Sequence, residues 1–459
     1  MNAERRLYFM LLAAKKIERQ HLATLSVLYR LIAQTRDIVN GKGERELAYM
    51  QIYIWWHFYP ELAIHAFIHF FYGLSHPWGS WKDIKYFCEY VYKKTGYPYH
   101  PLILEACNIL ICQLKYDETS DYPSLAAKWC PREKKKYGWL YNIIVFYYYP
   151  RSTPHTEKSF TWAKMSLRKT LAAINRRLKT VEIDMCDRKW DEIEYENAPS
   201  IALMKYLRCF EKRAPKKTHQ YITDLTLSKS SINGRRCPLS SLIRQALQGD
   251  SKLIDLQWQE YTRQICPLNC VPIIDLSSLV AMDPVRLYTA IGLGIIVSEK
   301  HKGEFKDRVM VFSGKPEWVN LGGLTLKAKI QKLSRKIGGE SNVTAPIELI
   351  AQSMKFLNIE KTEIEKLQLL IVADKIEYSK IKKIFGDMPR LAFWNMGKGS
   401  VPCDVDQDRT LVLSGYNPIL LNTLCGNYRK TGKITPWSRL EKMVEKYDVL
   451  DKKIRDYFS

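Results

Sequence analysis

The sequence of 459 residues lacks an uninterrupted apolar run of about 20 residues, the length that a membrane-spanning helix needs. Its N-terminus has only a short apolar patch between charged residues, too brief for the core of a secretory signal peptide. The 11 cysteines are odd in number, and no two of them have the CxxC spacing of redox motifs and zinc sites. We therefore expect reduced cysteines in an intracellular, cytoplasmic protein that has no membrane partner.

Sequence motifs of common enzyme classes are also missing. No GxGxxG follows a predicted strand, and neither a P-loop nor a GxSxG sequence is present. These motifs supply phosphate-binding loops and activated serine nucleophiles. The sequence gives no positive support for catalysis, so we expect a protein that is not an enzyme, with a hydrolase of unrecognised site as the remaining alternative.

Acidic residues are too few to balance the basic ones. The chain has 71 Lys and Arg residues against 48 Asp and Glu residues, a net charge of +23 at pH 7. This excess favours polyanionic partners, above all RNA, although a basic total can also serve solubility alone. The most basic stretch, 205–245, has turn residues at Pro215, Gly234 and Pro238 and is interpreted as a linker or exposed loop. Its candidate phosphate-binding residues, which could equally be a solvated charged face, are Lys212, Arg213, Lys216, Lys217, Arg235 and Arg236.

Residues 1–210 predict one helix after another. Strand signals are almost absent there, and apolar residues cluster densely around Pro60, which divides a buried helical hairpin. Stacked helical pairs of the HEAT type are the expected architecture, arranged as a ring or arc. The further predicted helices are 81–95, 101–116, 122–130, 133–149 and 160–178.

From residue 268 the pattern changes to strands that alternate with helices. Short, almost wholly apolar strands predict a doubly wound parallel sheet covered by helices on both faces. Ligands of such sheets bind beyond the carboxyl ends of the strands, where Asp275 and Asp374 stand. The predicted strands are 271–276, 307–313, 367–374, 390–396 and 409–415.

This order, with Asp275 at the end of the first strand followed by Ser277 and Ser278, resembles a von Willebrand factor A domain. That family binds a metal ion through Asp-x-Ser-x-Ser after the first strand, a Thr from a second loop and an Asp from a third. The resemblance places Asp275, Ser277, Ser341 and Asp374 at ligand positions, whereas the third position of the first motif is Leu279, which cannot ligate. Oxygen ligands of this kind suit Mg²⁺. Two interpretations stay open: a magnesium site with a reduced ligand set, or a relic whose aspartates only cap strand ends.

The N-terminal half carries a second resemblance, spread over several motifs. They are TRDIVNGKGERELAYMQIYIWW at 35–56, GSWKD at 79–83, PREKKKYGWL at 131–140, LRKTLAAINRRLKTVE at 167–182, FWN at 393–395 and LSGYNPILL at 413–421. They resemble the TROVE module of Ro-type ribonucleoprotein autoantigens and, still more closely, the domain-of-unknown-function family 2828 of plants and large DNA viruses. The Ro resemblance implies a helical ring closed by the A domain and an RNA-binding role.

Within 35–56, two interpretations of the charged residues remain. The motif can be structural, with Arg36, Asp37, Glu44 and Arg45 in a buried ion network beside a glycine turn, or Arg36, Lys42 and Arg45 can meet phosphate. The structural interpretation is favoured.

These observations predict four segments. They are an α-helical TROVE-like repeat domain at 1–210, a basic connecting segment that completes it at 211–267, a von Willebrand factor A-like domain at 268–430, and a C-terminal helix at 431–459 that packs back on the helical domain. The expected function is non-enzymatic RNA binding through phosphate contacts. The alternative is a structural or adaptor protein of a large assembly, such as a viral particle, that recruits a protein ligand through the A domain.

Overall fold

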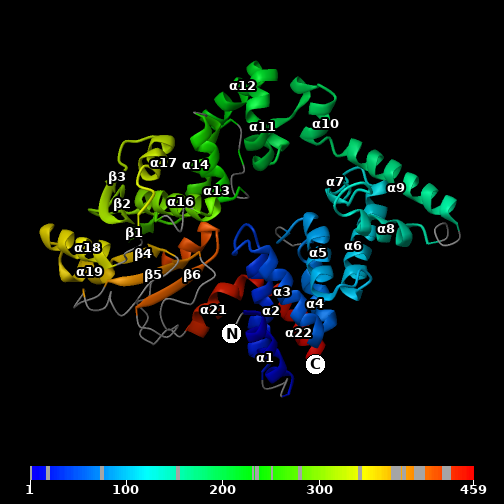
Figure 1. Cartoon of the computed structure of the whole chain (residues 1–459), viewed down its shortest axis with the longest axis horizontal. Coiled ribbons are helices and arrows are strands. Elements are labelled where there is room, and N and C mark those ends of the chain that lie inside the picture. Colours follow the sequence, from blue (N-terminus) through cyan, green and yellow to red (C-terminus); the bar gives the residue numbers. More distant parts are fainter. Residues whose placement is uncertain are drawn as a thin grey trace. The chain divides into compact units, whose positions relative to one another are not determined.

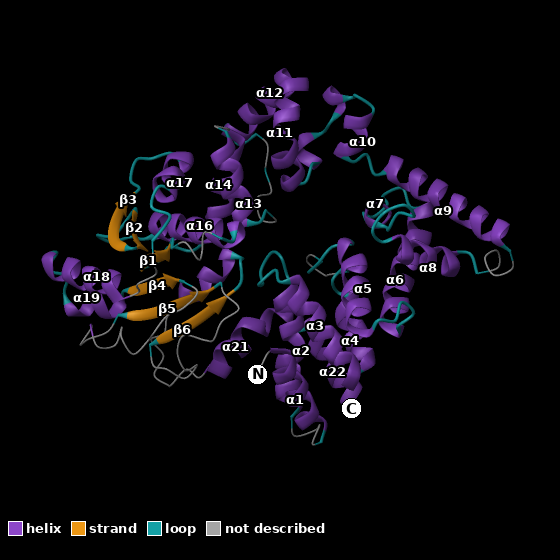
Figure 2. Ribbon diagram, in the orientation of Figure 1, coloured by secondary structure: helices purple, strands orange, loops and turns teal. Residues whose placement is uncertain are grey.

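The computed structural model of the chain forms two compact units (Figures 1 and 2). The first consists of Met1–Glu194 together with Leu440–Ser459, and the second of Tyr195–Arg439. The structure describes residues 3–16, 21–72, 77–150, 156–229, 232, 237–249, 252–277, 282–339, 344–373, 384, 389–396, 409–425 and 436–459.

The described part of the first unit is helical, as the sequence predicts. Pro60 begins α4 directly after α3, where its missing N–H leaves no bond unmade. Consecutive helices pack as neighbours, α3 on α4, α5 on α6 and α8 on α9. The helices are α1 (Ala3–Lys15), α2 (Leu22–Arg36), α3 (Arg45–Phe58), α4 (Pro60–Ile68), α5 (Lys82–Thr95), α6 (Pro101–Thr119), α7 (Ala126–Trp129), α8 (Gly138–Tyr148), α9 (Glu157–Arg177), α10 (Val181–Cys186) and, at the C-terminus, η5 (Glu445–Tyr447) and α22 (Val449–Phe458).

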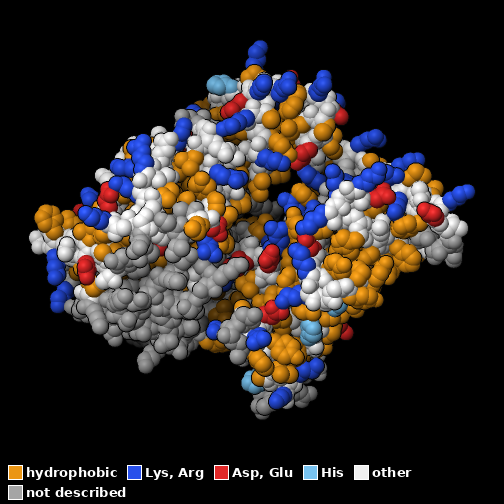
Figure 3. Space-filling view, in the orientation of Figure 1, with side chains coloured by type: hydrophobic (Ala, Val, Ile, Leu, Met, Phe, Trp, Pro, Cys, Tyr) orange, Lys and Arg blue, Asp and Glu red, His pale blue; other side chains and the backbone are white. Residues whose placement is uncertain are grey.

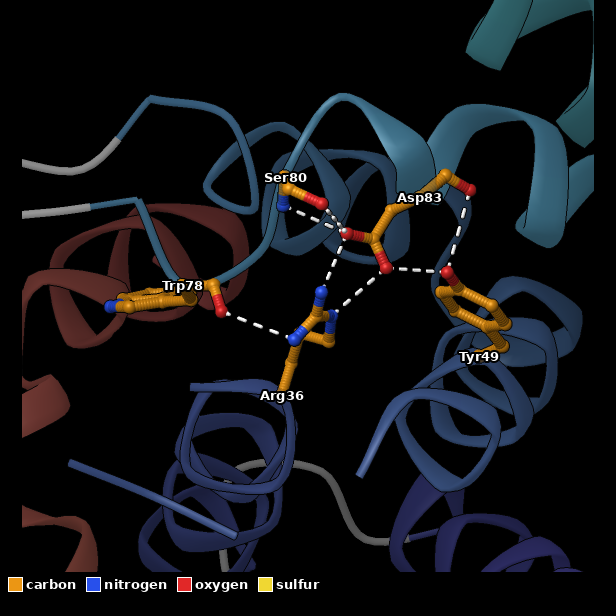
Figure 4. Close-up of polar contacts among 5 residues, drawn as sticks. All are labelled: Arg36, Tyr49, Trp78, Ser80 and Asp83. Atoms are coloured by element: carbon orange, nitrogen blue, oxygen red, sulfur yellow. Dashed lines mark hydrogen bonds and ion pairs between the residues drawn. The ribbon is translucent and has the colours of Figure 1, made fainter. Parts of the chain in front are cut away.

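A buried ion pair joins two of the sequence motifs in this unit (Figure 4). Arg36, at the end of α2, donates from Nε to Oδ1 of Asp83 at 2.9 Å and from Nη2 to Oδ2 at 2.6 Å. Tyr49 donates its hydroxyl to the same carboxylate, and the Ser80 N–H donates to Oδ2 at 2.8 Å. Burial, followed by the Asp83 charge, raises the pKa of Tyr49 well above its usual value, so the hydroxyl remains a donor.

The network therefore differs from the one expected within residues 36–45. Arg36 pairs with a carboxylate of the GSWKD segment, while Arg45 is exposed. The side chain of Asp37 instead closes the turn after α2, because its Oδ1 accepts from Val39 N–H at 2.8 Å and Asn40 N–H at 3.1 Å. The structural interpretation of Arg36 is confirmed, with a different partner.

The C-terminal segment contributes to the same unit. Tyr447 donates its hydroxyl to Oδ2 of Asp37 at 3.0 Å, and its ring lies edge-on to Trp78 with centroids 5.6 Å apart. In α22, the Asp451 carboxylate lies 3.2 Å from Nε of Arg30 in α2. The last helix thus completes the packing of α2, a helix more than 400 residues earlier in the chain.

Most of the described residues of the basic stretch 205–245 are helical, so it is not a linker. Its apolar residues Leu203, Leu207 and Phe210 recur at helical spacing on one buried face, and its cations occupy the other. These helices belong to the second unit, whose boundary is at Glu194 and Tyr195. They are α11 (Ser200–Arg213), α12 (Pro215–Thr226), α13 (Leu239–Gln248) and α14 (Lys252–Arg263).

A six-stranded sheet forms the centre of the second unit, with strand order β3-β2-β1-β4-β5-β6. Neighbouring strands are parallel except β3, which runs antiparallel to β2 at the edge after a turn at Gly314. This exposed edge strand was missed from the sequence. The strands are β1 (Cys270–Asp275), β2 (Arg308–Ser313), β3 (Lys315–Asn320), β4 (Gln368–Val372), β5 (Arg390–Asn395) and β6 (Thr410–Ser414).

Helices cover both faces of this sheet, which confirms an α/β unit. On one face, α16 (Pro284–Lys300) approaches β1 so closely that a Cβ on Gly294 would lie 3.2 Å from Ile274. On the other face, Ile273 packs in a core with Ile347 and Ile350 of α18 (Thr344–Phe356). No helix in the described residues has the length and apolar character to cross a membrane.

Candidate functional site

The carboxyl ends of β1, β2 and β4 meet at one edge of the sheet. The parallel register pairs Asp275 with Phe312 of β2, and Ile274 with Val372 of β4. Asp275 and Ser277 are both buried at this edge, and the Ser277 N–H donates to Oδ1 of Asp275 at 2.8 Å. The structure therefore places these two predicted residues together, at the position where ligands of such sheets bind.

The hydroxyl of Ser277 is a buried polar group that needs a partner. Only 1% of the residue is exposed, and its Oγ has no hydrogen-bond partner among the described residues. A carboxylate and a hydroxyl side by side fit two ligand positions of a Mg²⁺ site. The other two predicted ligands, Ser341 and Asp374, lie outside the described residues, as does Leu279. No group of three or more His, Cys, Asp or Glu side chains that could hold a metal occurs within the described ranges.

A hollow of about 350 Å³ adjoins the same edge. Ser313, at the end of β2, and Gly338 line it, and the Gly338 N–H donates to the Leu276 carbonyl oxygen at 3.0 Å. Leu276 lies between Asp275 and Ser277 in the chain. The backbone between the two candidate ligands is therefore hydrogen-bonded to a residue that lines the hollow, and the hollow could admit a partner's side chain.

The second predicted region is the corner between α11 and α12. Lys212 and Arg213 are in the last turn of α11, and Lys216 and Lys217 are in the first turn of α12. Ala214 is buried between them, whereas Lys212, Arg213 and Lys216 are exposed. Lys217 is half-buried, and its Nζ lies 5.9 Å from the centroid of the buried Tyr195 ring. Lys and Arg side chains gather over α11 and α12 at the top of Figure 3. Within the described residues, Lys212, Arg213 and Lys216 form no ion pair with a carboxylate. Arg235 and Arg236 lie outside the described residues.

A third group of cations, in the first unit, was not predicted. It lies around the indole of Trp129 in α7, and we call it the Trp129 cluster: Arg45, Lys82, Lys85, Lys128 and Arg132, with the rings of Tyr86, Trp129 and Tyr137. In the sequence, the segments GSWKD and PREKKKYGWL served only as motifs of the family resemblance. The available signal was the i, i+3 spacing of Lys82 and Lys85, which predicts two cations on one helix face.

Two family models match the chain, and neither carries a described function. Residues 111–267 match "Domain of unknown function (DUF2828)", and residues 269–453 match "Domain of unknown function (DUF7788)". The first match agrees with the resemblance seen in the sequence motifs, but it covers a shorter range than those motifs, which run from 35 to 421. The two matches meet immediately before β1.

A protein of a large DNA virus is similar over most of the chain. It is "Uncharacterized protein L728" of Acanthamoeba polyphaga mimivirus, 22% identical over an alignment of 479 positions that includes 92% of this chain and 79% of that protein. The similarity thus spans both units.

Proposed function

We propose that the protein binds RNA without enzymatic activity and contacts RNA phosphates through basic surfaces. The observation that carries this proposal is the α11–α12 corner, where exposed cations from two helices lie together and three of them have no carboxylate partner among the described residues. The net charge of +23 supports it, because a polyanion is attracted to the whole molecule as well as to this corner.

The position of these cations on their helices adds a physical argument. Lys212 and Arg213 are at the C-terminal end of α11, where cations are favoured, whereas Lys216 and Lys217 are at the positive N-terminal end of α12. A phosphate at the corner would be attracted by the free N–H groups of α12 and by the four side chains. A bound anion would thus lower the electrostatic energy of this corner, because it offsets the repulsion between the cations and the positive end of α12.

Replacing Lys212, Arg213, Lys216 and Lys217 together by Gln is expected to weaken RNA binding by about tenfold or more at low salt. The slope of log K against log salt concentration should also fall by about 3, since fewer counterions are released. Fluorescence anisotropy with a structured RNA, measured over a series of salt concentrations, checks both values. The backbone packing of α11 and α12 should change little, because Lys212, Arg213 and Lys216 are exposed and Lys217 is only half-buried beside Tyr195.

The matched control removes the same number of charges from lysines that already pair with carboxylates. These are Lys94, Lys189, Lys336 and Lys366, whose partners are Glu4, Glu192, Glu317 and Glu363. Equal losses in the two variants would show that only the total charge matters. Negligible RNA affinity of the wild-type protein at low salt would refute the proposed function, and RNA recovered by crosslinking from native protein would identify the bound species.

For the finer architecture we propose a TROVE-like arrangement of helical pairs in the first unit and a von Willebrand factor A-like second unit. Consecutive helices that pack on each other, such as α3 with α4 and α5 with α6, support the first assignment. A doubly wound sheet with Asp275 and Ser277 directly after β1 supports the second.

A second candidate function, a structural or adaptor role in a large assembly, is favoured by the unpartnered Ser277 hydroxyl. In this role, Asp275 and Ser277 would hold Mg²⁺, and a partner protein's carboxylate would complete its coordination beside the hollow. The similarity to a viral protein is compatible with such an assembly.

Ser277→Ala tests this role. Since the hydroxyl makes no hydrogen bond among the described residues, its removal should change the unfolding free energy by less than about 0.5 kcal/mol in EDTA. Wild-type protein should gain thermal stability on addition of MgCl₂, and the variant should gain less. A destabilised variant in EDTA, or equal magnesium effects on both proteins, would contradict a ligand role for Ser277.

A further inference from the structure

The Trp129 cluster brings cations from three separate segments onto shared aromatic rings. Lys82 Nζ lies 4.1 Å and Lys85 Nζ 5.0 Å from the centroid of the Trp129 ring, and Lys128 Nζ lies 5.8 Å from it. The guanidinium carbon of Arg45 lies 4.4 Å from the centroid of the Tyr86 ring. Cation–π attraction of this kind holds ammonium and guanidinium groups in place without neutralising their charge.

Lys85 is at the centre of the cluster. Besides Trp129, its ammonium lies 5.4 Å from the Tyr86 centroid and 5.8 Å from the Tyr137 centroid. Lys82 and Lys85 are both half-buried, so water only partly solvates their side chains. The Trp129 ring therefore holds the ammonium groups of Lys82, Lys85 and Lys128 within 5.8 Å of its centroid.

Carboxylates do not balance this charge. Asp83 is occupied by Arg36, Glu89 pairs with Lys93 and Lys136, and Glu133 faces Lys164 and Arg168. Among the described residues, the carboxylate that forms an ion pair with a cation of the cluster is that of Glu182, which lies 2.6 Å from Nζ of Lys128. Among the described residues, Arg45, Lys82 and Lys85 form no ion pair.

The uncompensated charge has an energetic cost. Burial is the largest cause that lowers the pKa of Lys82 below its usual value, and neighbouring cations lower it further. Burial and nearby cations likewise lower the pKa of Lys85. Lys82 and Lys85 also occupy the first turn of α5, where the helix dipole disfavours cations. Apart from each other, the groups that act on these two lysines are Arg45, Lys128, Arg132, Asp83 and Cys130.

We propose that the Trp129 cluster is a phosphate-binding site that holds the backbone of an RNA strand. A bound phosphate supplies the negative charge that the surrounding carboxylates do not, and several cations at fixed directions suit its oxygens. The phosphate chemistry follows from the cluster itself. The identification of RNA as its source rests on the proposed function, and a free polyphosphate is the other source of the same chemistry.

The first test replaces Lys82 and Lys85 together by Gln. We expect the affinity for a fluorescent oligouridylate at low salt to fall by about tenfold or more, while the melting temperature without RNA rises, because a repulsion has been removed. A merely structural cation–π role gives the opposite stability result, a lower melting temperature. Unchanged affinity, or a loss of stability that accounts for the loss of binding, would overturn the proposal.

The matched variant keeps the charges, with Lys82 and Lys85 both replaced by Arg. It should retain most of the RNA affinity, since guanidinium groups also bind phosphate and stack on rings. Loss of binding in this variant to the level of the Gln variant would overturn a charge-based site.

The pH dependence of stability gives a readout independent of any ligand. A lysine whose pKa is lowered in the folded state binds fewer protons than in the unfolded state, so its cost is present at neutral pH and disappears as pH rises toward 10.5. The stability gained by the Gln variant should therefore be present at pH 7 and shrink as the pH approaches 10.5, the usual lysine value. A gain that is absent at pH 7, or that is constant with pH, would contradict the electrostatic argument.

Sodium tripolyphosphate separates this inference from the proposed function. If it raises the melting temperature of wild-type protein but not of the Gln variant, the phosphate site is supported even where the α11–α12 variant test fails. No shift with wild-type protein would overturn the phosphate site. If the Gln variant loses the tripolyphosphate effect but keeps the wild-type affinity for oligouridylate, the assignment of the site to RNA is overturned, whereas the phosphate site itself is not.

Discussion

Asp83→Asn is expected to lower the unfolding free energy of the first unit by about 3–5 kcal/mol. The substitution keeps the shape of the side chain but leaves the Arg36 guanidinium buried without its counter-ion, at 4% exposure. The chain has two units and need not unfold in one step. The measurement is therefore amide hydrogen exchange of α2, α3 and α5 over a urea series.

The surroundings of this ion pair provide two comparisons. Lys189→Gln removes one partner of an exposed pair in the same unit, and we expect a change of less than about 1 kcal/mol. The double variant with Arg36→Met and Asp83→Asn should lose less than the sum of its single changes, because no unpaired charge remains. If Asp83→Asn costs no more than Lys189→Gln, the pair does not stabilise the junction of the two motifs.

Gly41→Ala is expected to destabilise the turn between α2 and α3 by about 3 kcal/mol. A Cβ at this position would lie 2.0 Å from the Gln34 carbonyl oxygen and 3.0 Å from that of Asp37, so the backbone itself has to move. That movement would strain the Lys42 N–H donation to Gln34 O, which is 2.9 Å long and closes the turn. The same hydrogen-exchange measurement reports the loss.

Gly43 gives the control within the same turn. Its φ is +70°, but a Cβ there would meet only the Ile38 Cα at 3.7 Å. Gly43→Ala should therefore cost only about 1 kcal/mol, from the left-handed backbone, and Gly43→Asn less. Equal costs at the two glycines would mean that close backbone approach is not what requires Gly41. A reduced RNA affinity without loss of stability in Gly41→Ala would instead favour a phosphate-binding turn.

The sequence predicted the sheet well because its central strands are continuous apolar runs. β1, β4 and β5 are buried on both faces, and their residues leave little choice of secondary structure. β3 was missed because Lys315 and Glu317 are exposed on an edge strand, where charge prevents further pairing and hides the strand pattern. Similarly, the many cations of α11 and α12 led to the interpretation of a linker, although the apolar residues of these helices have amphipathic spacing.

In the candidate sites, residues that are neighbours in sequence could be expected to lie together from the sequence alone. Asp275 and Ser277 are two positions apart, so the strand end alone brings them together. The Trp129 cluster depends on the packing of α3, α5 and α7, which no local pattern contains. The partner of Arg36 was missed for the same reason, since Asp83 is 47 residues away.

The return of α22 to α2 has a consequence for biosynthesis. The first unit begins at the N-terminus, yet its packing is finished by Leu440–Ser459, so the second unit is an insertion within it. A growing chain that has released only residues 1–194 still lacks Tyr447 and the hydrogen bond that this residue makes to Asp37. The ribosome therefore has to translate the codons for residues 440–459 before α2 can acquire these neighbours, and termination before them would leave this surface of α2 uncovered.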